Sequence, residues 1–167
     1  MGLILVVWET MNADHIRHLF EYHFTLNRKF WHFCIESLSW KQMTEKVEIS
    51  VGSIRNQFVH IMSVDEGWFN GLRMKPDTGH HNPENFGNPE EIRLQWDLVE
   101  AEMRMYLDGL TDSDLEKPFQ DSMKIWNVLS HVVNHGTAHR AQIGAMLRHF
   151  GFKPPPQDYI FFVLGRI

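Results

Sequence analysis

Apolar side chains recur at intervals of three or four residues through four long stretches of this chain, and this spacing restricts its fold more than any other feature. Each stretch would carry an apolar stripe along one face of an α-helix, and such a stripe has to be buried against other helices. The alternation of apolar and polar residues that is typical of strands is almost absent. The sequence therefore predicts an all-α protein built as a four-helix bundle.

Capping residues and helix breakers set the expected ends of these helices. Asn, Asp and Ser accept hydrogen bonds from the first free amides of a helix, Pro fits its first turn, and Gly often follows its last. We expect the four helices to begin and end near these residues: Asn12 or Asp14 to Ser39, Ser53 to Leu72, Pro89 to Gly109, and Ser122 to Phe150.

Two segments outside the helices carry further information. Residues 74–88 contain Pro, Gly, Asn and a His-His pair without a helical period, and they are longer than most bundle loops. They predict a long crossing loop between helices 2 and 3, of the kind that joins parallel helices. The tail 159–164 is too apolar to be solvated, so we expect it to pack back on the bundle or against another subunit, as in a homodimer.

Length, charge and cysteine content exclude several classes of protein. A chain of 167 residues suits one domain, which we place at 12–167 with residues 1–11 as an N-terminal extension. The apolar run 3–8 lacks the flanks of a signal peptide and the length of a membrane anchor. A net charge of −5 with scattered Lys and Arg argues against nucleic-acid binding. The only cysteine, Cys34, predicts a small buried residue and a cytoplasmic protein without an internal disulfide.

Three histidines spaced four apart, His131, His135 and His139, are the chemical signal of the last helix. Residues four apart lie on one face about 6 Å apart along the axis, whereas residues eight apart are about 12 Å apart. One ion can therefore be chelated by 131/135 or by 135/139, but not by 131/139. Placed at 100° per residue, the apolar stripe of this helix lies closest to His139 and then to His135, so the inward pair is 135/139.

A buried pair of neutral histidines needs partners, and two interpretations remain open on the residues alone. A divalent ion satisfies both rings at once, and so does a set of structural hydrogen bonds. A metal site also needs a third ligand from another helix, and periodicity does not choose it. The candidates are His15, His18, His23, His32, His60, Asp65 and Glu66.

Three further sets of polar residues lie near this pattern. Arg140 is expected to form a surface or packing salt bridge, with a substrate carboxylate or a partner subunit as the alternative. His80 and His81 are expected to be exposed loop residues, with the mouth of a pocket as the alternative. His131 is expected beside the site or on the surface.

The segment from Trp126 to Gln142 resembles the signature helix of DinB/YfiT-like proteins. The segment from Ser53 to Ile61 with Glu66 and Trp68 is similar to that family's second helix, and Asp158-Tyr159 is similar to its tail. The resemblance covers the chain from about Asn12 to its end. The chain departs from the family in having Ala at 141, where Gly is common, and in lacking an aromatic residue before Asn27.

This resemblance implies a four-helix bundle with a long crossing loop between helices 2 and 3 and a metal triad of His60, His135 and His139. It also implies one divalent transition metal (Zn, Ni, Fe or Mn), a homodimer, and a small-molecule substrate. Characterised relatives include S-transferases and isomerases that use a low-molecular-weight thiol such as bacillithiol, so a metal-dependent thiol S-transferase is the leading interpretation.

Other functions of a three-histidine site are weighed against this one. A non-catalytic bundle would use the ion for stability or for sensing a ligand, and a metal-dependent hydrolase would need a general base such as Asp65 or Glu66. The chain has no Glu-x-x-His and no His-Glu-x-x-His motif. A carboxylate di-iron protein and a zincin protease are therefore disfavoured.

Overall fold

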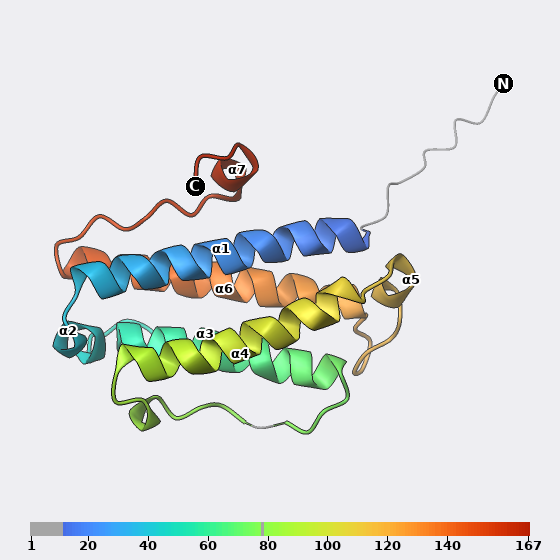
Figure 1. The fold of residues 1–167 in the computed structure, drawn as a ribbon, viewed down its shortest axis with the longest axis horizontal. Coiled ribbons are helices and arrows are strands. Elements are labelled where there is room, and N and C mark those ends of the chain that lie inside the picture. The colour runs from blue at the N-terminus through green and yellow to red at the C-terminus, as the bar shows by residue number, and fades with distance from the viewer. Residues whose placement is uncertain (1–11, 78) are drawn as a thin grey trace.

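The computed structural model describes residues 12–77 and 79–167, and the expected extension over residues 1–11 lies outside them. Four long helices dominate the described part, with no named strand among its elements (Figure 1). The all-α four-helix bundle is therefore confirmed. The long helices are α1 Ala13–Ser37, α3 Ile54–Leu72, α4 Pro89–Asp108 and α6 Ile125–His149. The short ones are α2 Trp40–Thr44, η1 Pro83–Asn85, α5 Asp112–Leu115 and α7 Tyr159–Val163.

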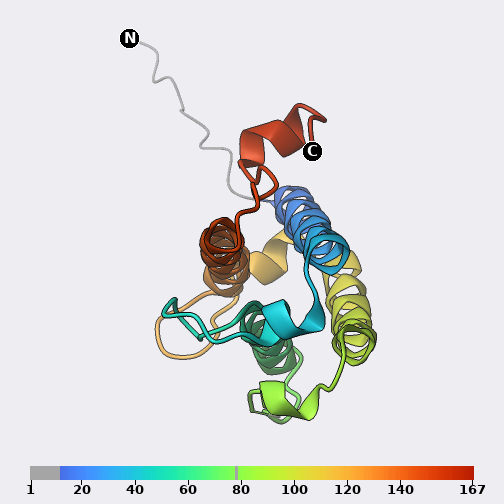
Figure 2. The ribbon, with the colours of Figure 1, turned by 90° about the vertical axis from the view of Figure 1, so that its left-hand side faces the viewer.

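The four long helices lie at the corners of a square (Figure 2). Helix α3 packs against α6 and α4, and α1 packs against the same two helices from the opposite corner. The colours of Figure 1 show that α3 and α4 run in the same direction, with residues 73–77 and 79–88 returning along the outside of the bundle between them. The predicted long crossing between parallel helices is confirmed.

Side-chain caps explain why three of these helices begin where they do. The side chain of Asn12 accepts a hydrogen bond from the amide of His15 at 2.9 Å, and Ser53 accepts one from Asn56 at 3.1 Å. Asn88 caps α4, whose first residue is Pro89 as expected. These contacts satisfy amides that have no partner within the helix.

The expected start of the last helix at Ser122 is wrong, because α6 begins at Ile125 with Lys124 as its N-cap. Residues 118–124 instead form a tight turn that is closed by a bond from the amide of Phe119 to the carbonyl oxygen of Met123, 2.8 Å. The Asn127 side chain accepts a hydrogen bond from the backbone amide of Lys124 at 2.8 Å. This turn carries the side chain of Phe119 toward α3.

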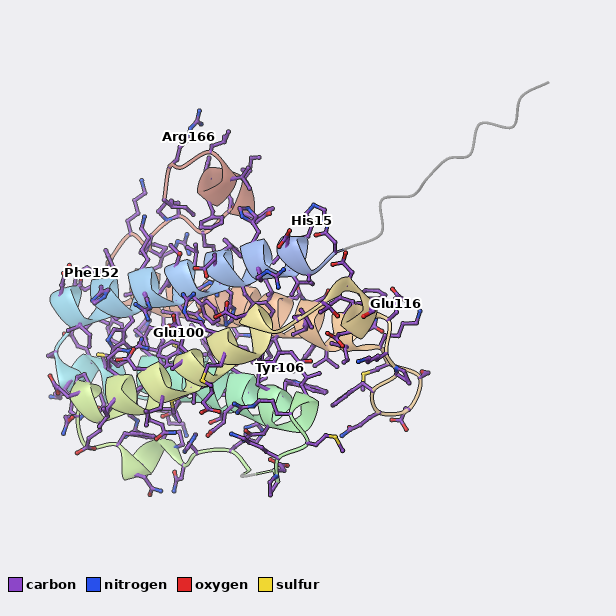
Figure 3. All side chains as sticks on the ribbon, turned by 45° about the vertical axis from the view of Figure 1, so that its right-hand side comes forward. His15, Glu100, Tyr106, Glu116, Phe152 and Arg166 are labelled. Atoms are coloured by element: carbon purple, nitrogen blue, oxygen red, sulfur yellow. The ribbon has the colours of Figure 1, made fainter. Side chains whose placement is uncertain are left out.

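Side chains fill the space between the helices (Figure 3), and many of the buried ones are aromatic. Trp31 of α1, Phe58 of α3 and Trp96 of α4 meet with ring centroids 5.0 to 6.0 Å apart. Cys34 is fully buried beside this core, as expected, and burial raises the pKa of its thiol to about 12. Within the described residues, no helix is both long enough and apolar enough to cross a membrane.

Glu100, labelled in Figure 3, links α4 to α1. Its side chain is almost fully buried and accepts a hydrogen bond from Arg28 of α1 at 3.0 Å and another from Arg104 at 2.8 Å. A buried carboxylate with two guanidinium partners fixes the pairing of these helices.

A second set of buried polar residues joins α1, α3 and α6. His23 Nε2 lies 3.0 Å from the Asp65 carboxylate and 3.0 Å from the Asn27 amide nitrogen, and Arg140 donates to Asn27 Oδ1 at 2.7 Å. We call His23, Asn27, Asp65 and Arg140 the buried polar cluster; none is more than 3% exposed. The expected surface or packing salt bridge of Arg140 is therefore wrong, because its partners are Asn27 and Thr137 and its guanidinium lies over the Tyr22 ring.

The apolar tail packs back on the bundle, which confirms the first of its two expected positions. The Tyr22 hydroxyl donates to the carbonyl oxygen of Gln157 at 2.8 Å, and the Tyr22 ring meets those of Tyr159 and Phe162 edge-on. Ile160, Val163 and Leu164 remain about half exposed.

Replacing Gly136 of α6 by Ala should destabilise the protein, because a Cβ at this position would lie 2.4 Å from the ring of His23. We expect a loss of about 1–3 kcal/mol in the free energy of unfolding, the usual cost of overpacking a core. Urea unfolding followed by circular dichroism measures it.

Gly67→Ala on α3 is the matched control, because nothing lies within 4 Å of its added Cβ. That variant should gain roughly 0.5–1 kcal/mol through the helix propensity of Ala. A Gly136→Ala protein as stable as Gly67→Ala would contradict the packing of His23 against α6.

Candidate metal centre

Three histidines from two helices meet on one side of the bundle. His60 of α3 and His135 and His139 of α6 each offer a ring nitrogen, and these nitrogens all lie within 4.8 Å of one another. The ring centroids of His135 and His139 are 4.2 Å apart, and that of His60 lies 4.5 Å from His139. The pair that periodicity chose on the last helix thus lies together with the residue that the resemblance supplied.

The distances within this histidine cluster fit a divalent ion. The Nε2 atoms of His60 and His135 are 3.2 Å apart. Two nitrogens bound to one zinc ion at 2.0–2.1 Å with tetrahedral angles would be about 3.3 Å apart. All three rings are only partly buried, so one side of the cluster faces solvent. The cluster fits a metal-binding protein.

Two glutamines orient His139. Its Nδ1 lies 2.6 Å from Gln57 Oε1, and the Gln57 amide group donates in turn to Gln142 Oε1 at 3.0 Å. Because Gln57 Oε1 can only accept a hydrogen bond, His139 Nδ1 carries the proton. The Nε2 atom of His139 then has a free lone pair with which to bind an ion. Such outer hydrogen bonds are what hold a ligating histidine in place. Sequence reasoning missed both glutamines, because neither belongs to a metal-ligand pattern.

The environment keeps all three rings neutral. Burial is the main cause that lowers the pKa of each, and the neighbouring histidines lower the pKa of His60 and His135 further. For His135 the pKa falls to about 3. Its Nδ1 is also buried without a hydrogen-bond partner among the described residues. Neutral imidazole is the form that binds a metal ion.

The other candidates for a third ligand lie elsewhere. His15, His18 and His32 are exposed on α1. His23 is bound to Asp65 within the buried polar cluster, and Glu66 lies 2.6 Å from the Nε2 atom of His81. Both carboxylates are therefore bonded to histidines outside the cluster.

A cavity of about 580 Å³ opens beside the cluster. His60 and His135 lie in its wall, and so does His80 of the crossing loop, which is exposed as expected and also lines the pocket. His81 is only partly exposed and is bonded to Glu66. His131 lines it too and meets the Trp68 ring edge-on at 5.4 Å. The remaining wall comes from α3, from the start of the crossing loop and from the turn before α6.

Comparison with known proteins identifies the family. Residues 11–165 match the model of the DinB family. The chain is also similar to Protein DinB of Bacillus subtilis (strain 168), with 28% identity over 160 residues that cover 88% of this chain and 92% of that protein. The family match spans nearly the whole chain and both helices of the histidine cluster. This chain therefore belongs to the DinB family.

Proposed function

We propose that this protein binds one divalent transition metal ion through His60, His135 and His139 and uses it as a thiol S-transferase. The observation that carries the proposal is the open side of the histidine cluster, where two of its members form part of a cavity wall. Three neutral ligands with an accessible further position are the arrangement of a catalytic ion, whereas structural ions are enclosed by four protein ligands.

The ion would supply one piece of chemistry, which is to lower the pKa of a bound thiol so that it is a thiolate at neutral pH. The thiol itself has to come from a small molecule, of the bacillithiol type, because the thiol of Cys34 is buried and its pKa is raised. The thiolate sulfur then forms a bond to an electrophilic carbon, and the leaving group departs with the electrons of the bond that breaks.

The residues around the cluster favour thiolate attack over hydrolysis. A metal-dependent hydrolase commonly uses a general base that takes a proton from water. The two carboxylates nearest in sequence, Asp65 and Glu66, are bound to His23 and His81 and do not line the cavity. A thiol loses its proton far more easily than water does, so its reaction does not depend on such a base.

The cell compartment, the oligomeric state and the identity of the metal can be proposed as well. A free thiol cofactor persists in a reducing compartment, which supports a cytoplasmic protein. The exposed apolar side chains of α7, Ile160, Val163 and Leu164, support a homodimer in which a second copy covers them. Imidazole ligands accept zinc, nickel and iron, and manganese less readily, and availability in the cell decides among them.

Metal content should depend on the histidine pair of α6. Protein purified without an affinity tag is expected to hold about one equivalent of metal by elemental analysis, and the double variant His135→Ala, His139→Ala to hold none. His131→Ala is the matched control, since it removes a histidine from the same helix that is not one of the three proposed ligands. Parent protein that takes up no metal, even after reconstitution, would refute the site.

A thiol should reach the ion directly. In protein loaded with Co²⁺, adding 2-mercaptoethanol is expected to produce a sulfur-to-cobalt charge-transfer band, while ethylene glycol, which has hydroxyls in place of the thiol, should produce none. A chelator should also remove the ion readily, because the site is open. No band, together with resistance to the chelator, would indicate a closed structural ion and contradict the transferase proposal.

The metal-free protein should lose stability on acidification. Because the pKa of His135 is lower in the folded protein than the value of about 6.5 expected when unfolded, the unfolded chain binds more protons between these two values. The free energy of unfolding therefore falls as the pH drops below 6.5. Urea midpoints at pH 7 and pH 5 measure this. His135→Gln should reduce the fall, and an equal fall in both proteins would contradict the burial of this neutral ring.

A further inference from the structure

The cavity beside the histidine cluster continues as a groove along α3. Its α3 wall includes His60, Val64, Gly67 and Gly71, at spacings of four, three and four residues, which place them on one face of the helix. Eleven residues at 1.5 Å each make this wall about 16 Å long. The volume of about 580 Å³ lies within the range of small-molecule sites. The groove therefore suits an elongated ligand that starts at the cluster.

The far end of the groove is aromatic. Trp68 of α3 and Phe119 of the turn before α6 line it, with their ring centroids 6.3 Å apart. Phe119 also comes within 3.2 Å of the position that a Cβ on Gly71 would take, so this glycine admits the ring. Aromatic walls offer a flat apolar group both contact area and ring-to-ring attraction.

Gly67 keeps the middle of the groove open. A glycine inside a helix is unfavourable by roughly 0.5–1 kcal/mol relative to Ala. Packing does not account for it here, because no atom lies within 4 Å of the position that its Cβ would take. The missing side chain leaves free space between the histidine end of the groove and its aromatic end.

Three polar side chains in the wall already have partners. The Lys75 ammonium is bound to Glu102 at 2.9 Å, and the Asp77 carboxylate accepts from the amide of Gly79 at 2.9 Å. The Ser63 hydroxyl donates to the carbonyl oxygen of Val59 and accepts from the amide of His81. These bonds leave such groups less available to a sugar-like ligand, which needs many hydrogen bonds.

We propose that this groove binds the electrophilic substrate, and that the substrate has a flat aromatic body with its reactive group at the histidine end. This inference rests on the proposed function, since it assigns the substrate class of the same site. The aromatic body lies over Gly67 and packs against the rings of Trp68 and Phe119, and the reactive carbon lies next to His60 and His135.

Two hydroxamic acids test the inference, because they share one metal-binding group and differ in what it carries. Titration calorimetry on zinc-loaded protein should show 2-naphthohydroxamic acid binding about tenfold or more tightly than acetohydroxamic acid. In Gly67→Leu the added side chain fills the groove, so this preference should disappear while metal content and acetohydroxamic acid affinity stay unchanged. Ala101→Leu, at an exposed position of α4, is the matched control and should keep the preference.

Further measurements separate this inference from the metal site. Trp68→Ala removes one aromatic wall and should also reduce the preference, which keeps the test valid if Gly67→Leu folds poorly. Should the parent take up no metal, the proposed function fails, and binding of naphthalene-2-carboxamide to parent but not to Gly67→Leu still tests the groove alone. Equal affinities of the two hydroxamic acids, an unchanged preference in Gly67→Leu and Trp68→Ala, or tighter binding of gluconohydroxamic acid would each overturn the aromatic assignment.

Discussion

The close approach of α6 to α1 at Gly136 is the contact on which the histidine cluster depends. The ring of His23 lies where any side chain at position 136 would stand, so α1 and α6 can meet only with a glycine there. His135 precedes this glycine directly and His139 follows it by three residues, on either side of the contact. This contact sets the rotation of α6 about its own axis. It therefore also sets the direction in which the His135 and His139 side chains point. The same His23 ring is bonded to Asp65 of α3 at 3.0 Å, so the helix that carries His60 is tied to this contact as well.

Burying the charged groups of the buried polar cluster is unfavourable, because they lose their contact with water. The position of the cluster indicates what it contributes to the fold. Arg140 is fully buried, and burial lowers the pKa of its guanidinium, while Asp65 is 1% exposed. Charges in such places stabilise a protein little on balance, although removing one partner of a set is strongly destabilising. What hydrogen bonds between buried groups do provide is a preferred arrangement of the elements that carry them. Here these elements are α1, α3 and α6, and two of them carry the histidine cluster. Asp65 also places a negative charge near His60, which opposes the lowering of that ring's pKa.

Periodicity predicted the part of the site that one helix contains and failed where two elements had to be combined. The angles around the last helix selected His135 and His139 over His131, because a single helix fixes the relation between its own residues. The third histidine needed the family resemblance, since His60 lies at the flank of its apolar stripe and several histidines of α1 competed with it. The salt bridge expected of Arg140 was wrong because its partner Asn27 is uncharged. Asn27 is also 113 residues away, so no local pattern in the sequence indicates this contact. Ser122 was expected to cap α6 because it is a good capping residue, but the turn that holds Phe119 extends to Lys124.

Three of the glycines within helices have different roles that the sequence alone does not reveal. In a helical pattern each of them signals only a weaker helix, and nothing distinguishes Gly67, Gly71 and Gly136 from one another. Their neighbours differ completely: His23 lies against Gly136, Phe119 lies against Gly71, and the space beside Gly67 is empty. The first two glycines allow elements of the fold to approach, so packing in the folded protein offsets their cost. No contact offsets the cost of Gly67, and the empty space lies in the wall of the cavity that leads to His60 and His135. A glycine that has no role in packing, in the wall of the cavity beside His60 and His135, supports the proposed ligand groove.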